Sequence, residues 1–251
     1  MQKKLPQGFG STTDDAQPLA GQVVLVTGGA RRLGRAICET LWQQGASIVI
    51  HYHRSMADAQ ALASQLGSRA RIVQADLRDR AATENMFASV LAECLRIDAV
   101  VCNAAAFVRT PIETLDDAAW DDLIAVNLTA PRRCLQLGIA AGAKVIVNVA
   151  DVGATQAWRG YAAYGVSKAG LLQLTKIAAK ELIGRVRVNA VLPGFVLPPD
   201  DASEDELARL SAKWAGYPAG SPLDVARAVA FLLREPFLTG VCLPVDGGQS
   251  L

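Results

Sequence analysis

The sequence predicts an α/β fold, a doubly wound parallel sheet of about seven strands with helices on both faces. Short apolar runs rich in β-branched residues alternate with longer amphipathic stretches, which is the pattern of buried parallel strands and covering helices. A glycine-bearing turn follows the first run and opens the first helical stretch. The chain has 251 residues, enough for one large α/β unit with a sizeable core. Strand, helix and strand repeated in this way form right-handed crossovers.

Seven apolar runs bounded by glycine, proline or polar residues are expected to be the strands. They lie at residues 23–26, 48–50, 71–73, 99–102, 145–149, 186–192 and 241–245. Between them, helical patterns are expected at residues 33–44, 56–67, 79–95, 117–140, 161–183 and 222–234. The last helix begins with Ser221 and Pro222, an N-cap residue followed by a first-turn proline.

One domain is expected to hold most of the chain. Residues 21–251 read as a single Rossmann-type domain, and residues 1–20 read as a flexible N-terminal leader. The leader carries basic residues without a hydrophobic segment behind them, so it does not resemble a signal peptide. Residues 195–220 contain prolines and a short acidic piece and have poor strand character. They are expected to form a mobile loop beside the substrate.

The composition excludes several classes of protein. A net charge of +1 gives no reason to expect nucleic-acid binding, and no apolar run is long enough to span a membrane. The five cysteines are an odd number, widely separated and free of CxxC or Cys/His clusters. This pattern argues against a disulfide framework and against a metal site. A cytoplasmic protein with free thiols is the expectation.

The glycine-bearing turn after the first strand predicts a nucleotide site. The stretch TGGARRLG runs from Thr27 to Gly34 at the first strand-to-helix junction. Glycines there let the backbone approach a pyrophosphate, and the helix N-terminus is aimed at its charge. A short structural turn is the alternative interpretation.

The end of the second strand favours NADPH over NADH. An NAD site would place an acidic residue about 20 positions past the glycine turn, and the stretch HYHRS has none. His53, Arg54 and Ser55 instead offer cationic and hydroxyl donors suited to a 2′-phosphate. Packing or a solvated edge remains an alternative for His53, and more so for His51.

The stretch from Asp151 to Lys168 can bring a carboxylate, a phenol and an ammonium to one site. Lys168 follows Tyr164 by four residues, so on a helix the two side chains share a face. The lysine charge there is expected to lower the pKa of the phenol and prepare it for proton transfer. An ordinary surface pair is the alternative interpretation of this spacing.

Seven motifs together resemble the short-chain dehydrogenase/reductase family over about residues 21–251. Any one of them is weak, but their occurrence in order and with matching spacing is specific. They are TGGARRLG, Asp76-Leu77, Asn103-Ala104-Ala105, Asn127, Tyr164 with Lys168, Pro193-Gly194 and Asp246-Gly247-Gly248.

The resemblance implies hydride transfer with NAD(P)H, with Tyr164 and Lys168 as catalytic residues. Asn127 would help to hold a water that relays protons, and Lys168 would also hold the cofactor ribose. Asn103 would stabilise the central strand close to the cofactor. The other implied cofactor contacts are Thr27, Gly28, Arg32, Leu33, Gly34, Asp76, Leu77, Ala104, Pro193 and Gly194.

Two departures from the common family pattern resemble the pteridine reductases of this family. Arg32 replaces the middle glycine of TGxxxGxG, and Asp151 replaces the serine expected thirteen residues before the tyrosine. The resemblance then implies that Arg32 lies beside cofactor phosphate and pterin. It also implies that Phe107 stacks on the pterin and that Tyr161 is a further aromatic contact. Packing of Phe107 and Tyr161 beneath a loop is the alternative.

The carboxyl of Asp151 indicates a class of substrate even without the family resemblance. A carboxylic acid can hold and deliver a proton to a ring nitrogen, which favours a C=N bond as substrate. The alternative is that Asp151 only caps the segment after the fifth strand.

Three functions remain. The first is NADPH-dependent reduction of a dihydropterin, dihydrofolate or oxidised pterin, with Asp151, Tyr164 and Arg32 on the substrate side. The second is a carbonyl reductase of the 3-oxoacyl-thioester or small-ketone type, and the third is a cofactor-binding protein without turnover. A homotetramer is expected, because helical residues are apolar on more than one face. They are Leu171, Leu172, Leu174, Ile177 and Leu182.

Overall fold

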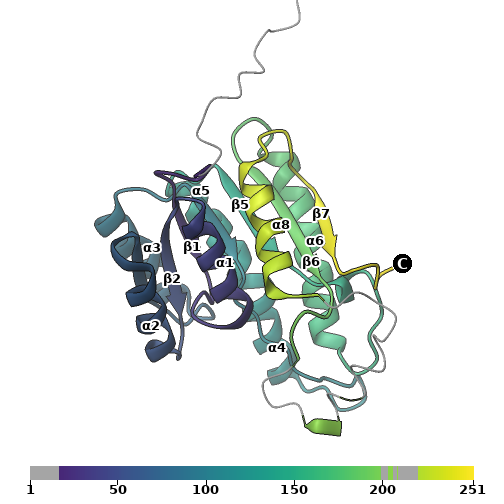
Figure 1. Cartoon of the computed structure of the whole chain (residues 1–251). Helices are drawn as coiled ribbons and strands as arrows, with labels where there is room; N and C mark the ends of the chain where they lie inside the picture. The colour runs from purple at the N-terminus through teal and green to yellow at the C-terminus, as the bar shows by residue number, and fades with distance from the viewer. Residues whose placement is uncertain (1–16, 199–202, 206–207, 209–219) are drawn as a thin grey trace, which may run out of the picture.

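Seven parallel strands form one sheet in the order β3-β2-β1-β4-β5-β6-β7 (Figure 1). The computed structural model describes residues 17–198, 203–205, 208 and 220–251. The strands are β1 (Val23–Val26), β2 (Ser47–Tyr52), β3 (Ala70–Gln74), β4 (Ala99–Cys102), β5 (Val145–Val149), β6 (Arg187–Pro193) and β7 (Cys242–Val245). The predicted doubly wound parallel sheet is therefore confirmed.

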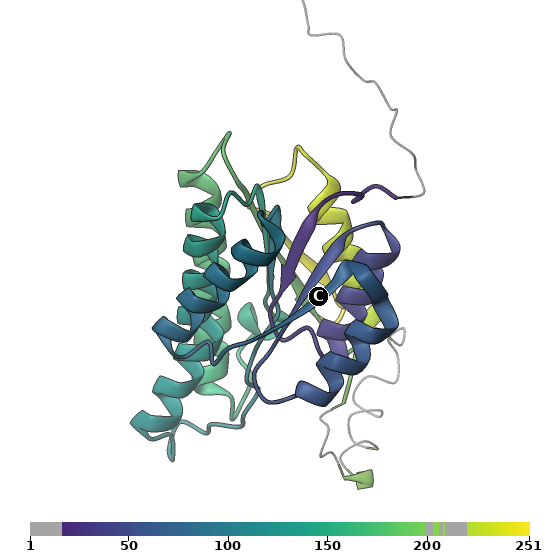
Figure 2. The same ribbon diagram turned by 90° about the vertical axis from the view of Figure 1, so that its left-hand side faces the viewer.

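Helices cover both faces of the sheet (Figure 2). They are α1 (Arg32–Gln43), α2 (Met56–Leu66), α3 (Arg80–Cys94), α4 (Asp117–Ile124), α5 (Ala130–Ala140), α6 (Ala162–Glu181) and α8 (Pro222–Arg234). One core joins α1, α2 and α8 to the sheet, and the other joins α3, α5 and α6 to its opposite face. Within β1, Val24 packs in the first core and Leu25 in the second, as the alternation of a strand requires.

The order of the strands reverses beside β1. The chain runs outward from β1 to β3 and then returns to β4, which pairs with the other edge of β1. Ligands of such sheets bind at the carboxyl ends of the strands next to this reversal. The glycine turn after β1 and the Asn103 segment after β4 both lie there.

The helix expected at residues 117–140 is not continuous. A π-helical turn at Ala125–Thr129 separates α4 from α5 and contains Asn127. Pro131 has no N–H to donate to the carbonyl of Asn127, four residues earlier, so the regular α-helical pattern fails at this point. Single π-helical turns of this kind occur frequently at functional sites.

The folded unit begins earlier than residue 21. Leu19 is buried, and its N–H donates to the carbonyl of Gln44 at 2.8 Å. The rest of the expected leader, residues 1–16, and most of the expected loop at 195–220 lie outside the described residues. The start of α8 agrees with the prediction, since Ser221 is the N-cap, Pro222 is the first helical residue, and Ser221 and Asp224 form a capping box. In the described part of the chain, no helix is long and apolar enough to cross a membrane.

Candidate active site

A cavity of about 1010 Å³ opens at the carboxyl ends of the central strands. This volume is at the upper end of the range for ligand pockets. Its described lining contains the predicted site residues with the exception of Thr27 and Asn127. Those that line it are Gly28, Arg32, Leu33, Gly34, His53, Arg54, Ser55, Asp76, Leu77, Asn103, Ala104, Phe107, Asp151, Tyr161, Tyr164, Lys168, Pro193 and Gly194.

The glycine turn is held from two neighbouring strands. Gly28 has a φ of +60° and donates its N–H to Nδ1 of His51 at 2.9 Å. From β4, the Nδ2 of Asn103 donates to the carbonyls of Thr27 and Gly28 at 2.9 and 3.0 Å. A Cβ on Gly34 would lie 2.0 Å from the Gly28 oxygen, so only glycine is tolerated there. The turn thus directs the N-terminus of α1 toward the cavity, as anion binding requires.

Thr27 supports the turn from behind the cavity wall. Its side chain is buried, and its Oγ1 accepts the N–H groups of Asn103 and Ala104 at 2.9 and 3.0 Å. The same hydroxyl donates to the carbonyl of Val101 at 3.3 Å. A direct cofactor contact by Thr27 remains a prediction.

Arg32 occupies the glycine position with a glycine-like backbone. Its φ is +52°, in the left-handed region where a side chain costs about 1 kcal/mol or more. Its Nη2 donates to the carbonyl of Pro198 at 2.5 Å, at the beginning of the loop after β6. Arg32 therefore links the glycine turn to the segment that borders the cavity on the substrate side.

His51 is a structural residue. The sequence alone did not decide between packing and a contact with a ligand. Because Nδ1 accepts from Gly28, the proton lies on Nε2, which donates to the Ala75 carbonyl at 3.1 Å. Burial lowers the pKa of His51 to about 4, so the ring is neutral near pH 7. The imidazole thereby joins the glycine turn to the end of β3, which supports the packing interpretation.

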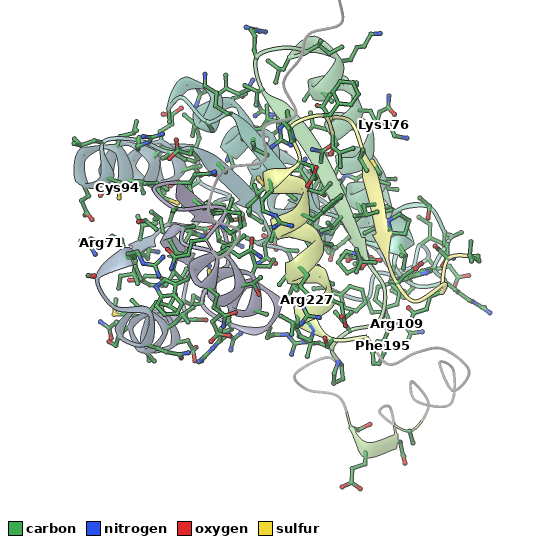
Figure 3. The ribbon with its side chains drawn as sticks, turned by 45° about the horizontal axis from the view of Figure 1, so that its top comes forward. Arg71, Cys94, Arg109, Lys176, Phe195 and Arg227 are labelled. Carbon is green, nitrogen blue, oxygen red and sulfur yellow. The ribbon has the colours of Figure 1, made fainter. Side chains whose placement is uncertain are left out.

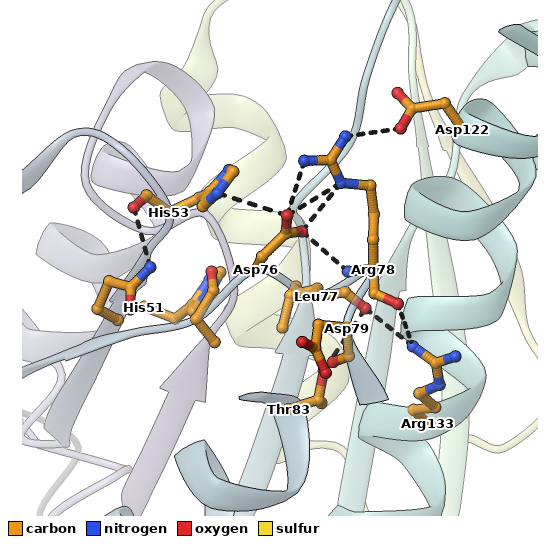
Figure 4. A network of polar contacts seen from close by, with 11 residues as sticks. His51, His53, Asp76, Leu77, Arg78, Asp79, Thr83, Asp122 and Arg133 are labelled. Atoms are coloured by element: carbon orange, nitrogen blue, oxygen red, sulfur yellow. Dashed lines mark hydrogen bonds and ion pairs between the residues drawn. The ribbon is translucent and has the colours of Figure 1, made fainter. Parts of the chain in front are cut away.

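A polar network closes the end of the cavity beyond β2 and β3 (Figure 4). Asp76 Oδ2 lies 3.6 Å from His53 Nε2 and 2.7 Å from Arg78 Nη2, and Arg78 Nη1 lies 2.7 Å from Asp122 Oδ1. The hydrogen bond from Arg78 is the main cause that lowers the pKa of Asp76 to about 2. Sequence reasoning missed Arg78 and Asp122, because 44 residues separate them and no local pattern joins them.

Arg54 and Ser55 line the cavity beside this network. In the part of the chain that the structure describes, Arg54 makes no ion pair and no side-chain hydrogen bond. Its charge is thus available to an anionic ligand.

The carboxylate, phenol and ammonium meet as the spacing predicted. Tyr164 donates its hydroxyl hydrogen to Oδ2 of Asp151 at 2.8 Å. Lys168, one turn further along α6, lies with Nζ 5.8 Å from the centre of the Tyr164 ring and donates to the Val149 carbonyl at 3.0 Å. Asp151 also caps the segment after β5, because its Oδ1 accepts the N–H of Gly153 at 2.6 Å. The capping interpretation of Asp151 is therefore confirmed, and its part in proton delivery remains a prediction.

Burial favours the protonated forms of Asp151 and Tyr164. It raises the pKa of Asp151, against the hydrogen bonds from Gly153 and Tyr164 and the charge of Lys168. It also raises the pKa of Tyr164 well above its usual range, and the nearby Asp151 adds to this effect. The expected lowering of the phenol pKa is thus wrong here, since burial and then Asp151 set the direction of the shift. Burial lowers the pKa of Lys168 itself to about 8.

Asn127 uses its side chain to hold a loop. Its Oδ1 accepts from the N–H of Ala106 at 2.8 Å, and its Nδ2 donates to the Ala106 carbonyl and to Ser167 Oγ at 2.9 and 3.2 Å. The residue is fully buried. Its part in a water relay remains a prediction.

Four aromatic side chains cluster around Tyr164 at the cavity. Phe107 stacks on Tyr161 with ring centres 4.8 Å apart and meets Tyr164 edge to face at the same distance. Trp158, which sequence reasoning missed, lies 6.2 Å from Tyr161 and 6.5 Å from Tyr164. Phe107 is half exposed, so it is not packed beneath a loop. Such rings offer flat faces to a flat ligand.

The C-terminal turn supports the end of β6. The Oε1 of Gln249 accepts the N–H of Phe195 at 2.7 Å, and Gln249 is almost fully buried. A Cβ on Gly194 would lie 2.5 Å from that oxygen and 2.7 Å from Asp246, so the predicted Pro193-Gly194 and Asp246-Gly247-Gly248 motifs meet here. Among the described residues, no group of three or more His, Cys, Asp or Glu could hold a metal ion. All five cysteines are free thiols.

Comparisons with known proteins agree with this geometry. Residues 28–250 match the sequence model of a family described as enoyl-(acyl carrier protein) reductase. The chain is 33% identical to the 3-oxoacyl-[acyl-carrier-protein] reductase FabG of Escherichia coli over 92% of its own length and 98% of the relative's. It is also 33% identical to pteridine reductase 1 of Leishmania tarentolae, over 96% and 99% of the two chains.

A solved structure extends the likeness to three dimensions. It is the FolM alternative dihydrofolate reductase 1 of Brucella canis in complex with NADP, with a TM-score of 0.86 and 30% identity over 94% of this chain and 96% of that one. The sheet order, the glycine turn and the Tyr164/Lys168 pair thus occur in a chain whose relatives match 92% to 96% of its length. The protein belongs to the short-chain dehydrogenase/reductase family of oxidoreductases.

Proposed function

We propose that this chain reduces a pterin ring with NADPH as the hydride donor. The observation that carries the proposal is the 2.8 Å hydrogen bond from Tyr164 to Asp151, a carboxyl whose pKa burial raises. Relatives named pteridine reductase 1 and alternative dihydrofolate reductase 1 support the same substrate class.

The cavity residues suit NADPH. The turn at Gly28 and Gly34 leaves no room for a Cβ at Gly34 and presents the N-terminus of α1 to a pyrophosphate. Arg54 and Ser55 would hold the 2′-phosphate, with Arg32 and His53 nearby, and Lys168 would hold the ribose. When bound, NADPH supplies the hydride.

Side chains of the protein would deliver the proton to the ring nitrogen. Reduction of a ring C=N bond adds hydride to the carbon and leaves the nitrogen in need of a proton. The carboxyl of Asp151 and the phenol of Tyr164 both lie at the cavity, and burial raises both pKa values and so favours their protonated forms. We therefore assign proton delivery to these two groups. The buried charge of Lys168 balances the negative charge that develops when they do. Phe107 and Tyr161 would contact the faces of the pterin.

A second candidate is a carbonyl reductase of the 3-oxoacyl-thioester type. The 33% identity to FabG and the description of the matching family favour it. In that case Tyr164 and Lys168 would act on a carbonyl, and the carboxyl of Asp151 would add nothing that a serine hydroxyl lacks.

One assay separates the two candidates. Oxidation of NADPH is followed in parallel with dihydrobiopterin, dihydrofolate and an acetoacetyl thioester. We expect turnover of the pterins to exceed that of the thioester. A wild-type protein that reduces the thioester far better than any pterin would replace the proposed function by the second candidate.

A further inference from the structure

The arginines that line the cavity differ in whether another group of the chain forms an ion pair or hydrogen bond with the guanidinium. Arg31 lies 3.9 Å from an aspartate, Arg78 bonds two aspartates, and Arg32 donates to a backbone carbonyl. For Arg54 and Arg159, no ion pair and no side-chain hydrogen bond occurs within the described ranges of the chain. Among the described residues, these two are therefore the lining arginines whose charge no group of the chain pairs.

Arg54 and Arg159 lie at different ends of the cavity. Arg54 follows β2, where the 2′-phosphate of NADPH would satisfy it. Arg159 follows Trp158 and precedes Tyr161, and both of these rings belong to the aromatic cluster of the substrate end. The cofactor would thus pair with Arg54, and Arg159 would still lack an anionic partner.

A second arginine lies against the same loop. A Cβ built on Gly160 would meet Nε of Arg109 at 3.1 Å and its Nη2 at 3.8 Å, so the guanidinium of Arg109 lies along the residue next to Arg159. The backbone fixes this arrangement, because the N–H of Thr110 donates to the Gly160 carbonyl at 2.7 Å. In the view of Figure 3, Arg109 lies at the same end of the molecule as Phe195. Phe195 lines the cavity, and Arg109 lies beside the described lining through its contact with Gly160.

The described acids of the cavity do not neutralise this pair of arginines. Asp76 and Asp122 bond to Arg78, and Asp151 bonds to Tyr164. Like Arg159, Arg109 is exposed and makes no ion pair with any described residue. The rim beside the aromatic cluster is thus positively charged, and its guanidinium groups match the geometry of carboxylates.

We propose that Arg109 and Arg159 form a carboxylate subsite for the side chain of the substrate. The inference rests on the proposed pterin reduction and narrows it. The preferred substrates are pterins whose tail carries carboxylates, as the glutamate of a folate does, rather than pterins with a short uncharged tail.

The test compares two substrates that share the ring and differ in the tail. Dihydrofolate carries the anionic glutamate, and dihydrobiopterin carries an uncharged dihydroxypropyl group. For Arg109→Gln and Arg159→Gln, the ratio of kcat/KM for dihydrofolate to that for dihydrobiopterin should fall about twofold to fivefold each, the range of exposed ion pairs. In the double variant it should fall roughly fivefold to twentyfold, mainly through KM.

Arg185→Gln is the matched control. This exposed arginine lies in the turn before β6, at the opposite end of the strands, so the ratio should equal that of the wild type. Salt gives a readout without any variant. The KM of the wild type for dihydrofolate should rise with sodium chloride more steeply than that for dihydrobiopterin.

The outcomes separate this inference from the proposed function. If the wild type reduces both pterins but neither the double variant nor salt changes the ratio, the subsite is overturned and pterin reduction stands. A wild type that reduces neither pterin overturns both. A fall in the ratio, with thermal unfolding of the variants unchanged, supports the subsite.

Discussion

Tyr164 donates its hydroxyl hydrogen to Asp151 at 2.8 Å, while Nζ of Lys168 lies 5.8 Å from the centre of the same ring. Two acids with raised pKa values are thus in direct contact beside a buried ammonium. A serine at residue 151 could donate a hydrogen bond to a carbonyl but could not serve as a reservoir of protons. The carboxyl is therefore the residue on which the proposed reaction can be tested most directly.

Asp151→Asn should lower pterin reduction by about 10²–10⁴, the usual contribution of general acid catalysis. Asparagine keeps the size and polarity of the side chain, and its oxygen can still accept the N–H of Gly153. It has no acid proton to deliver. Single-turnover rates with dihydrobiopterin measure the loss, and NADPH titration should give nearly the wild-type affinity. Full pterin activity in Asp151→Ser would show that the carboxyl is dispensable.

Arg54→Ala should weaken the use of NADPH by about tenfold to a hundredfold and leave the use of NADH nearly unchanged. A charge-assisted hydrogen bond to the 2′-phosphate is worth about 1.5–3 kcal/mol, and NADH has no such phosphate. Values of kcat/KM for both cofactors measure the effect. Arg80→Ala is the control, because Arg80 is exposed on α3 and pairs with Glu84. Equal losses with both cofactors would make Arg54 a structural residue.

The sequence predicted residues that gather at strand ends, because parallel strands place all their carboxyl ends at one edge. Asp151 was located in this way, after the apolar run 145–149, and the resemblance to the reductase family supplied Asn103 and Pro193, which also lie at strand ends. Contacts between distant surface residues carry no such pattern, which is why the bonds from Arg78 to Asp122 and from Gln249 to Phe195 were missed. The direction of the Tyr164 pKa shift was also wrong, since it depends on how deeply the phenol is buried.

We still expect a homotetramer, but fewer exposed apolar residues support it than the sequence analysis cited. Of the five apolar residues cited for it, Leu171, Leu172 and Leu182 are buried in the chain's own core. Val166 and Ile177 are about half exposed, and their spacing of eleven residues puts them on the same face of α6. That stripe is the described surface of α6 that a second copy would cover.

Ile177→Glu should therefore shift the assembly toward smaller species, because it places a charge in the proposed contact. Light scattering at micromolar concentration measures the mass of the wild type and the variant. Leu95→Glu is the matched control, since it adds the same charge at an exposed apolar residue outside α6. A wild type that is monomeric under these conditions would refute the expectation.

His51 should make the folded state sensitive to acid. Its pKa is about 4 in the folded protein and about 6.5 in the unfolded chain, so between these values the unfolded chain binds more protons. The stability contribution of His51 is complete above pH 6.5 and declines as the pH falls toward 4. From pH 7 to pH 5 the loss is about 2 kcal/mol. In His51→Gln the side chain stays neutral, so unfolding free energies from urea titrations should decline less steeply over this interval. Parallel curves for wild type and variant would mean that the buried imidazole does not titrate on unfolding.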